Sequence, residues 1–144
     1  MANPKRNDPY KSFNFIVEID GIASAGFTEC SGLSTETTVI EYREGSGGGI
    51  RKLPGLRKYT NVTLKRGLTA NRDLWNWYKS LTDGILQRRN VSIILLADDR
   101  TEVARFTLSQ AWPCKWIGPA LNAKGNDIAI EELELAHEGF DFET

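Results

Sequence analysis

Alternation of apolar and polar residues dominates the chain and predicts a mainly β protein. In Phe13–Asp20 every second residue is apolar, which predicts a half-buried strand. Glu102–Gln110 repeats this pattern, whereas Val91–Ala97 is almost wholly apolar, as in a strand covered on both faces. In Ile128–Leu135 the alternation slips by one residue at Glu131–Glu132, which predicts a β-bulge there.

One segment, Asn71–Thr82, has the period of a helix. Asn71 is a suitable N-cap, and Gly84 can adopt the left-handed conformation that ends a helix. Trp75 lies off the apolar stripe, so we expect it at the edge of the stripe or in a contact. The stripe itself has the spacing i, i+3, i+4 and i+7 and consists of Leu74, Trp77, Tyr78 and Leu81.

These elements sum to about seven or eight strands and one helix. The fold class that they predict is mainly β (α+β), a β-barrel or sandwich with the helix over one opening. The chain is long enough for a single domain, residues 1–144, preceded by a polar N-terminal arm at residues 1–12.

Two long strands, Ser34–Glu44 and Tyr59–Arg66, are predicted to be neighbours with a polar face toward water. Their β propensity is high throughout, although neither face of the first strand is strongly apolar. The positions assigned to this pair are Thr35, Thr37, Val39, Glu41, Arg43, Tyr59, Asn61, Thr63 and Lys65.

The connection between these strands is predicted to be an extended loop at residues 45–57. It is longer than the roughly two to five residues that join paired strands. Apolar side chains on a loop too flexible to build its own core need a partner, and we expect another copy of the chain to supply it. The predicted contact residues are Glu44, Gly47, Gly48, Gly49, Ile50, Arg51, Lys52, Leu53, Leu56 and Arg57.

Charge is segregated along the chain, although the net charge is only -1. Cations gather in the middle and acids near the C-terminus. This arrangement suits head-to-tail contact between copies, and two unrelated solvated faces are the alternative. The acidic residues predicted to make contacts are Glu131, Glu132, Glu134 and Glu138.

Candidate chemistry is sparse, and we expect no catalytic, cofactor or metal site. His137 is the only histidine and has no nucleophile motif near it, and Cys30 and Cys114 are too few for a zinc site. The GSGGG run leads to Leu53-Pro54 and not to the Lys-Ser/Thr helix of a phosphate loop. The tryptophans do not interleave with cations as in a nucleic-acid-binding barrel. No apolar run is long enough to span a membrane, and no secretory signal is visible.

Four stretches together resemble the tail tube proteins of contractile phages and the inner-tube proteins of phage-derived contractile injection systems. The resemblance covers nearly the whole chain in the order of the family. The stretches are DPYKSFNFIVEIDG (Asp8–Gly21), GFTECSGLSTETTVIEYREG (Gly26–Gly45), LPGLRKYTNVTLKRGLT (Leu53–Thr69) and DLWNWY (Asp73–Tyr78).

The resemblance implies a structural subunit that forms hexameric rings, which stack into a hollow tube lined by strands from every subunit. It implies as partners other copies, a contractile sheath, baseplate and tube-terminator proteins, and effector or DNA cargo in the lumen. It further implies assembly in the bacterial cytoplasm into a phage tail or injection particle, without membrane insertion by the subunit. A type VI secretion-like tube protein, a baseplate tube initiator and a monomeric ligand-binding barrel remain alternatives.

Overall fold

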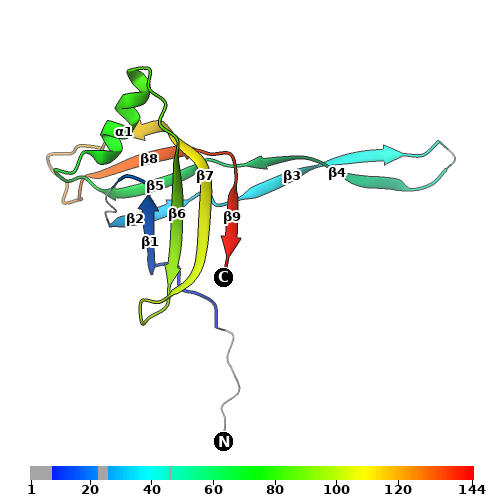
Figure 1. The fold of residues 1–144 in the computed structure, drawn as a ribbon, viewed down its shortest axis with the longest axis horizontal. Coiled ribbons are helices and arrows are strands. Elements are labelled where there is room, and N and C mark those ends of the chain that lie inside the picture. Colours follow the sequence, from blue (N-terminus) through cyan, green and yellow to red (C-terminus); the bar gives the residue numbers. More distant parts are fainter. Residues whose placement is uncertain (1–7, 23–25, 46) are drawn as a thin grey trace, which may run out of the picture.

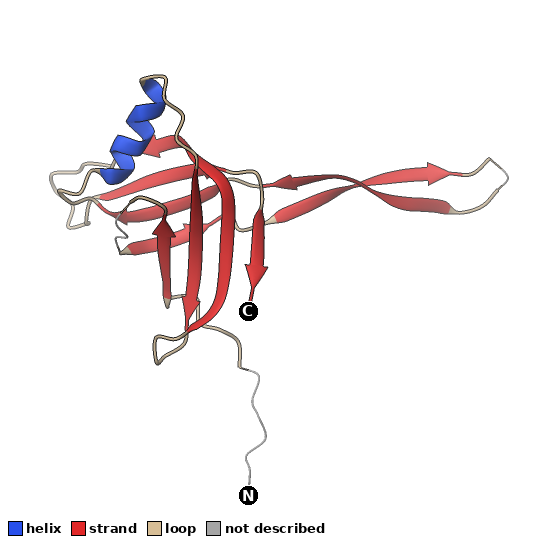
Figure 2. Ribbon diagram, viewed as in Figure 1, coloured by secondary structure: helices blue, strands red, loops and turns tan. Residues whose placement is uncertain are grey.

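The computed structural model describes residues 8–22, 26–45 and 47–144 (Figures 1 and 2). Residues 1–7 of the predicted N-terminal arm lie outside the described residues. The elements in chain order are β1 (Phe15–Ile19), β2 (Phe27–Ser31), β3 (Thr35–Arg43), β4 (Ile50–Tyr59), β5 (Val62–Gly67), α1 (Asp73–Thr82), β6 (Arg89–Leu96), β7 (Glu102–Ile117), β8 (Ile130–Ala136) and β9 (Phe140–Glu143).

Seven of the strands form one antiparallel sheet in the order β1-β6-β7-β8-β5-β2, with β9 beside β7. The sheet folds over on itself, so that β1, β6 and β9 run across β2, β5 and β8 (Figure 1). We call this sheet together with α1 the body. The predicted mainly β fold with one helix is confirmed.

The long strand β7 makes the fold possible because it belongs to both layers. Its first part pairs with β6 and β9, and Trp112–Ile117 pairs with β8. Between the two parts, Gln110 has a positive φ of 54°, and the register with β6 shifts between Arg89 and Val91. A bulge of this kind bends a strand and increases its twist, which carries β7 from one layer to the other.

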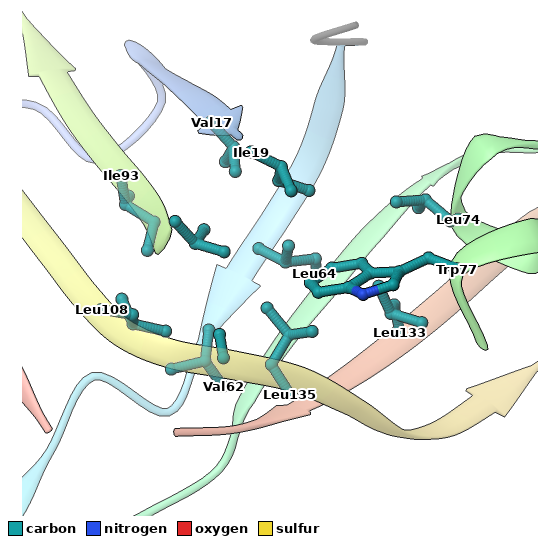
Figure 3. Packing of buried hydrophobic residues seen from close by; sticks show 12 residues of the cluster. Val17, Ile19, Val62, Leu64, Leu74, Trp77, Ile93, Leu108, Leu133 and Leu135 are labelled. Atoms are coloured by element: carbon teal, nitrogen blue, oxygen red, sulfur yellow. The ribbon is translucent and has the colours of Figure 1, made fainter. Parts of the chain in front are cut away.

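The core lies between the layers and beneath α1 (Figure 3). Along β5 and β8 alternate side chains are fully buried, and they meet residues of β1, β6 and β7 from the other layer. Figure 3 shows Trp77 closing one end of this cluster. The cluster consists of Val17, Ile19, Val62, Leu64, Leu74, Trp77, Val91, Ile93, Leu108, Ala111, Leu133 and Leu135.

The β-bulge predicted at Glu131–Glu132 is wrong. The pairing of β8 with β5 runs from Ile130 to Leu135 without a register shift. Glu131 takes the inward position that continues the alternation of Leu133 and Leu135. Ile128 is exposed outside the strand. The slip in the sequence pattern therefore marks a buried charge and not an extra residue.

The helix α1 begins at Asp73, two residues later than predicted. Asn71 is not the N-cap residue, but its side-chain oxygen still accepts a hydrogen bond from the Asp73 N–H at 2.9 Å. Of the four residues in the predicted stripe, two are buried and two are half-buried. The buried ones are Leu74 and Trp77, and the half-buried ones are Tyr78 and Leu81.

Candidate assembly surfaces

Among the residues that the structure describes, β3 and β4 pair only with each other, and they project from the body (Figure 1). We call β3, β4 and their connection the hairpin. Its apolar side chains are largely exposed, and Leu56 is the most exposed of them at 78%. An isolated two-stranded hairpin is marginally stable in water, so the hairpin needs a surface to pack against. The other exposed apolar residues are Val39, Ile40, Tyr42, Ile50 and Leu53.

The predicted loop at residues 45–57 is wrong in its second half. β4 begins at Ile50, so most of the predicted contact residues belong to a strand and only residues 44–49 connect the two strands. Pro54 is unusual inside a strand, which favoured the prediction of a loop. It is tolerated because β4 has β3 on one edge only, and the register shifts between Thr37 and Val39 where Pro54 pairs. The strand residues are Ile50, Arg51, Lys52, Leu53, Leu56 and Arg57, whereas Glu44, Gly47, Gly48 and Gly49 lie in the connection.

The predicted pairing of Ser34–Glu44 with Tyr59–Arg66 is also wrong. β3 pairs with β4, and β5 lies in the body between β2 and β8. The assigned positions are therefore divided between two surfaces. Thr35, Thr37, Val39, Glu41 and Arg43 lie on the hairpin with Tyr59 at its base, while Asn61, Thr63 and Lys65 lie on the body.

A hydrogen-bonded junction fixes the hairpin to the body. The Thr60 hydroxyl donates to the Gly32 carbonyl at 2.7 Å, and the Thr60 carbonyl lies 2.8 Å from His137 Nε2. His137 Nδ1 accepts from the Gly139 N–H at 3.1 Å, so the ring carries its proton on Nε2 and donates it to Thr60. His137 thus has a structural role at a point where three chain segments meet, which its sequence context did not reveal.

Gly32 is required at this junction. Its φ is +95°, and a Cβ atom there would lie 2.1 Å from the Asn61 carbonyl oxygen. Any other residue would meet both backbone strain and a collision with backbone that cannot move aside. The direction in which the hairpin leaves the body is therefore set by local packing.

The body has two open strand edges in the layer β7-β8-β5-β2. In the described part of the chain, β2 pairs only with β5, and Trp112–Ile117 of β7 pairs only with β8. Each step across this layer is antiparallel, so the three steps from β7 to β2 leave the two outer strands running in opposite directions. Unpaired edges present rows of N–H and C=O groups that can pair with another chain.

The face of this layer that points away from the core is polar. Lys65 Nζ lies 3.4 Å from a Glu132 oxygen and 3.5 Å from a Glu29 oxygen. The charges of Glu132 and then Glu29 raise the pKa of Lys65. Asn61 donates to Glu134 at 3.2 Å. Three of the predicted strand positions, Asn61, Thr63 and Lys65, thus share a face with two of the predicted acids.

Glu131 is not on this face, and the contact role predicted for it is wrong. Its side chain is 2% exposed and accepts a hydrogen bond of 2.7 Å from Arg66 Nε. Arg66 also donates to the Asn71 carbonyl at 3.3 Å, which ties the pair to the start of α1. Of the other acids, Glu138 is exposed in the turn between β8 and β9. The residue missed by sequence reasoning is Arg66, whose even spacing from Val62 and Leu64 could have indicated an inward side chain.

The described residues contain no cluster of three or more side chains suited to hold a metal ion. Within the same residues, no helix has both the length and the apolar content needed to cross a bilayer. Cys30 and Cys114 are free thiols. What the geometry offers is a set of surfaces for pairing and packing: two open edges, a polar sheet face and an exposed hairpin.

Comparison with known proteins supports this interpretation. The family model described as T4-like virus tail tube protein gp19 matches residues 11–141. No curated protein sequence matches the chain. A solved chain of the sheath-tube complex of the PVC extracellular contractile injection system in the extended state is 29% identical, with a TM-score of 0.87 and coverage of 95% of this chain and 93% of that one.

A chain of the 6-fold symmetrised anti-feeding prophage baseplate is 28% identical, with a TM-score of 0.85 and coverage of 95% of this chain and 97% of that one. Hcp1 from Flavobacterium johnsoniae is 11% identical, with a TM-score of 0.59 and coverage of 90% and 94%. At that identity the likeness to Hcp1 concerns the fold alone.

Proposed function

The chain belongs to the family of T4-like virus tail tube proteins, and from this premise we propose that its copies close into hexameric rings that stack into the inner tube of a contractile injection system or contractile phage tail. The observation that carries the proposal is the pair of open, oppositely directed edges on β2 and on Trp112–Ile117 of β7. The protein is a structural subunit without catalysis of its own.

Edge pairing between copies would complete the sheet. If Trp112–Ile117 of one copy lies beside β2 of the next, the two strands are antiparallel and the alternation across the layer continues unchanged. Repeated around a closed ring, this contact joins the four strands of every copy into one continuous barrel. Closure pairs both open edges of this layer, which favours a ring over a free subunit.

The polar face of the same layer would then line the channel. Its charged groups are paired within the subunit, as in the Glu132–Lys65–Glu29 contacts, and its opposite face is the buried core. A wetted inner wall of this kind suits a conduit for effector protein or DNA. The face lies on β5, which the predicted strand Tyr59–Arg66 largely covers, and on β8, whereas β3 of the predicted pair lies on the hairpin.

The hairpin would make the contacts between stacked rings. Its exposed apolar residues cannot be covered by its own two strands, and its cations, Arg51, Lys52, Arg57 and Lys58, favour an acidic partner surface. Glu138 is an exposed acid available for such a contact. The N-terminal arm is a further contact element in this proposal.

Beyond its own copies, the tube would contact a contractile sheath, the baseplate and a tube terminator, with assembly in the bacterial cytoplasm. The similar chains come from a sheath-tube complex and a baseplate, which supports the first two of these partners. When the sheath contracts, it would drive the tube and its cargo through a target envelope.

The test is the double variant Ile50→Asp/Leu56→Asp. Two buried charges at a contact are costly, so we expect a folded subunit that no longer forms tubes. Negative-stain electron microscopy and light scattering measure assembly, and circular dichroism measures folding. The matched control, Asn76→Asp/Asn122→Asp, adds the same two charges at exposed body positions and should still form tubes.

Long tubes from the hairpin variant would contradict the role given to the hairpin. A wild-type chain that stays monomeric at every concentration and salt would contradict the proposed function itself. That second result would favour a ligand-binding barrel.

A further inference from the structure

An apolar cleft of about 740 Å³ opens between β1 and β2, where the folded sheet does not close. Its walls are aromatic and aliphatic: Phe13 and Phe15 from the β1 side, Phe27 and Leu33 from the β2 side, and Ile93 from β6. Phe13 is 73% exposed at its mouth, and Glu29 and Cys30 line its β2 wall. An apolar cleft of this size is typical of a surface that receives a partner or ligand.

A complementary surface lies at the opposite edge of the same layer. Trp75 of α1 packs edge-on against Trp116 of β7 at 4.9 Å between ring centroids, and Trp75 also contacts Tyr78 at 6.1 Å. All three rings are half-buried. The Trp116 Nε1 atom is buried and finds no hydrogen-bond partner within the described part of the chain. These rings form a half-buried aromatic flank at the β7 edge of the layer.

We propose that the cleft of one copy receives the Trp75–Trp116 flank of the neighbouring copy in the same ring. This inference rests on the proposed ring, and it adds a contact between neighbouring copies beyond the strand pairing. When Trp112–Ile117 of one copy pairs with β2 of its neighbour, α1 and its tryptophans lie beside the paired strand of the first copy. The cleft lies beside β2 of the neighbour. The two therefore meet wherever the edges pair.

The charges beside the two surfaces fit this arrangement. Arg72 at the N-cap of α1 and Lys79 within it are exposed, and Glu29, whose carboxylate also contacts Lys65, lines the cleft. Ring closure then depends on aromatic packing into the cleft as well as on strand pairing.

Cys30 provides a native probe inside the cleft. With Cys114 replaced by serine, the variant Lys79→Cys places a second thiol on the α1 flank, and a short bismaleimide can join it to Cys30 of the neighbour. Burial and the adjacent Glu29 raise the pKa of Cys30 to about 11, so the reaction is run at about pH 8.5, where more thiolate is present. The matched control is Asn76→Cys, which lies farther round the helix from Trp75 than Lys79 does.

We expect assembled Lys79→Cys rings to give a covalent ladder on denaturing gels, about tenfold or more above the Asn76→Cys control, because a neighbouring thiol acts at high effective concentration. Tubes visible by microscopy without this excess would overturn the inference and leave the proposed function standing. A stronger cross-link from Leu53→Cys to Cys30 would also overturn it, because the hairpin would then occupy the cleft.

Cys30 labelling by a maleimide gives a second measurement that needs no new cysteine. We expect slower labelling in wild-type rings than in the Trp75→Ala variant, with Trp75→Phe retaining the protection. Equal labelling of all three would count against the cleft as a ring contact. If the wild-type chain forms no rings, the proposed function and this inference fall together.

Discussion

The body and the hairpin contain the same kinds of residue, but the body buries many of these side chains whereas the hairpin exposes them. Along β5 and β8 of the body every second side chain is buried, because a strand lies on each edge and a second layer covers one face. Along β3 and β4 nearly every side chain is exposed, because each strand has one neighbour and no layer covers either face. Burial is therefore decided by what lies opposite a strand and not by its composition.

Charged pairs show the same contrast. The Arg66–Glu131 pair in the body is 2.7 Å long and almost fully buried, whereas the Arg51–Glu44 pair at the end of the hairpin is 3.6 Å long and well exposed. The first pair is removed from water and depends on its partner. The second remains solvated, and its loss leaves both charges in water.

The largest effect should come from breaking the buried pair. Glu131→Ala leaves Arg66 charged and unpaired in the core, so we expect a loss of about 3–5 kcal/mol in the free energy of unfolding. Urea denaturation followed by circular dichroism measures it, in the Ile50→Asp/Leu56→Asp background so that assembly does not contribute. Glu44→Ala on the hairpin is the control and should cause no measurable change. A similar small change for both would refute the contrast.

A leucine truncation compares the two regions with identical chemistry. Leu64→Ala removes a fully buried side chain and should cost about 2–5 kcal/mol, while Leu56→Ala on the hairpin should cost less than about 0.5 kcal/mol in the free subunit. Urea unfolding midpoints of the isolated subunits measure both. In contrast, tube yield by microscopy should fall for Leu56→Ala. Equal losses of stability would mean that the hairpin packs against its own body in solution.

The smallest effect is a pH dependence that belongs to the body, since both cysteines lie there. Burial and then the charge of Glu29 raise the pKa of Cys30 from 9.0 to about 11. Above pH 9 the unfolded chain loses this proton while the folded chain keeps it. The unfolded state is therefore favoured, and the contribution that is complete below pH 9 is lost as the pH rises through about 11.

The expected loss is at most on the order of 3 kcal/mol. Unfolding measured between these pH values, in wild type and in Cys30→Ala, isolates it from the titration of lysines and tyrosines. Lys65, whose pKa is also raised, loses its contribution at high pH in both proteins and so cancels in the difference. Identical pH profiles would show that Cys30 is not buried in the folded subunit.

The sequence pattern predicted the strands, the helix and the family, because these depend on local periodicity and on motifs. Alternation in Phe13–Asp20 identified β1, and the stripe containing Leu74 and Trp77 identified α1. The resemblance to tail tube proteins was confirmed over residues 11–141. The sequence also predicted that the apolar residues around Leu53 and Leu56 would need a partner surface.

The tertiary structure alone decided which strand each of these segments would meet. It placed Ile50–Tyr59 beside β3, moved Thr63 and Lys65 into the body, and buried Glu131 against Arg66. Periodicity states which side chains share a face, but whether that face meets water, a second layer or another copy depends on strand order. Strand order is set by contacts between residues far apart in the chain, and a local pattern carries no record of them.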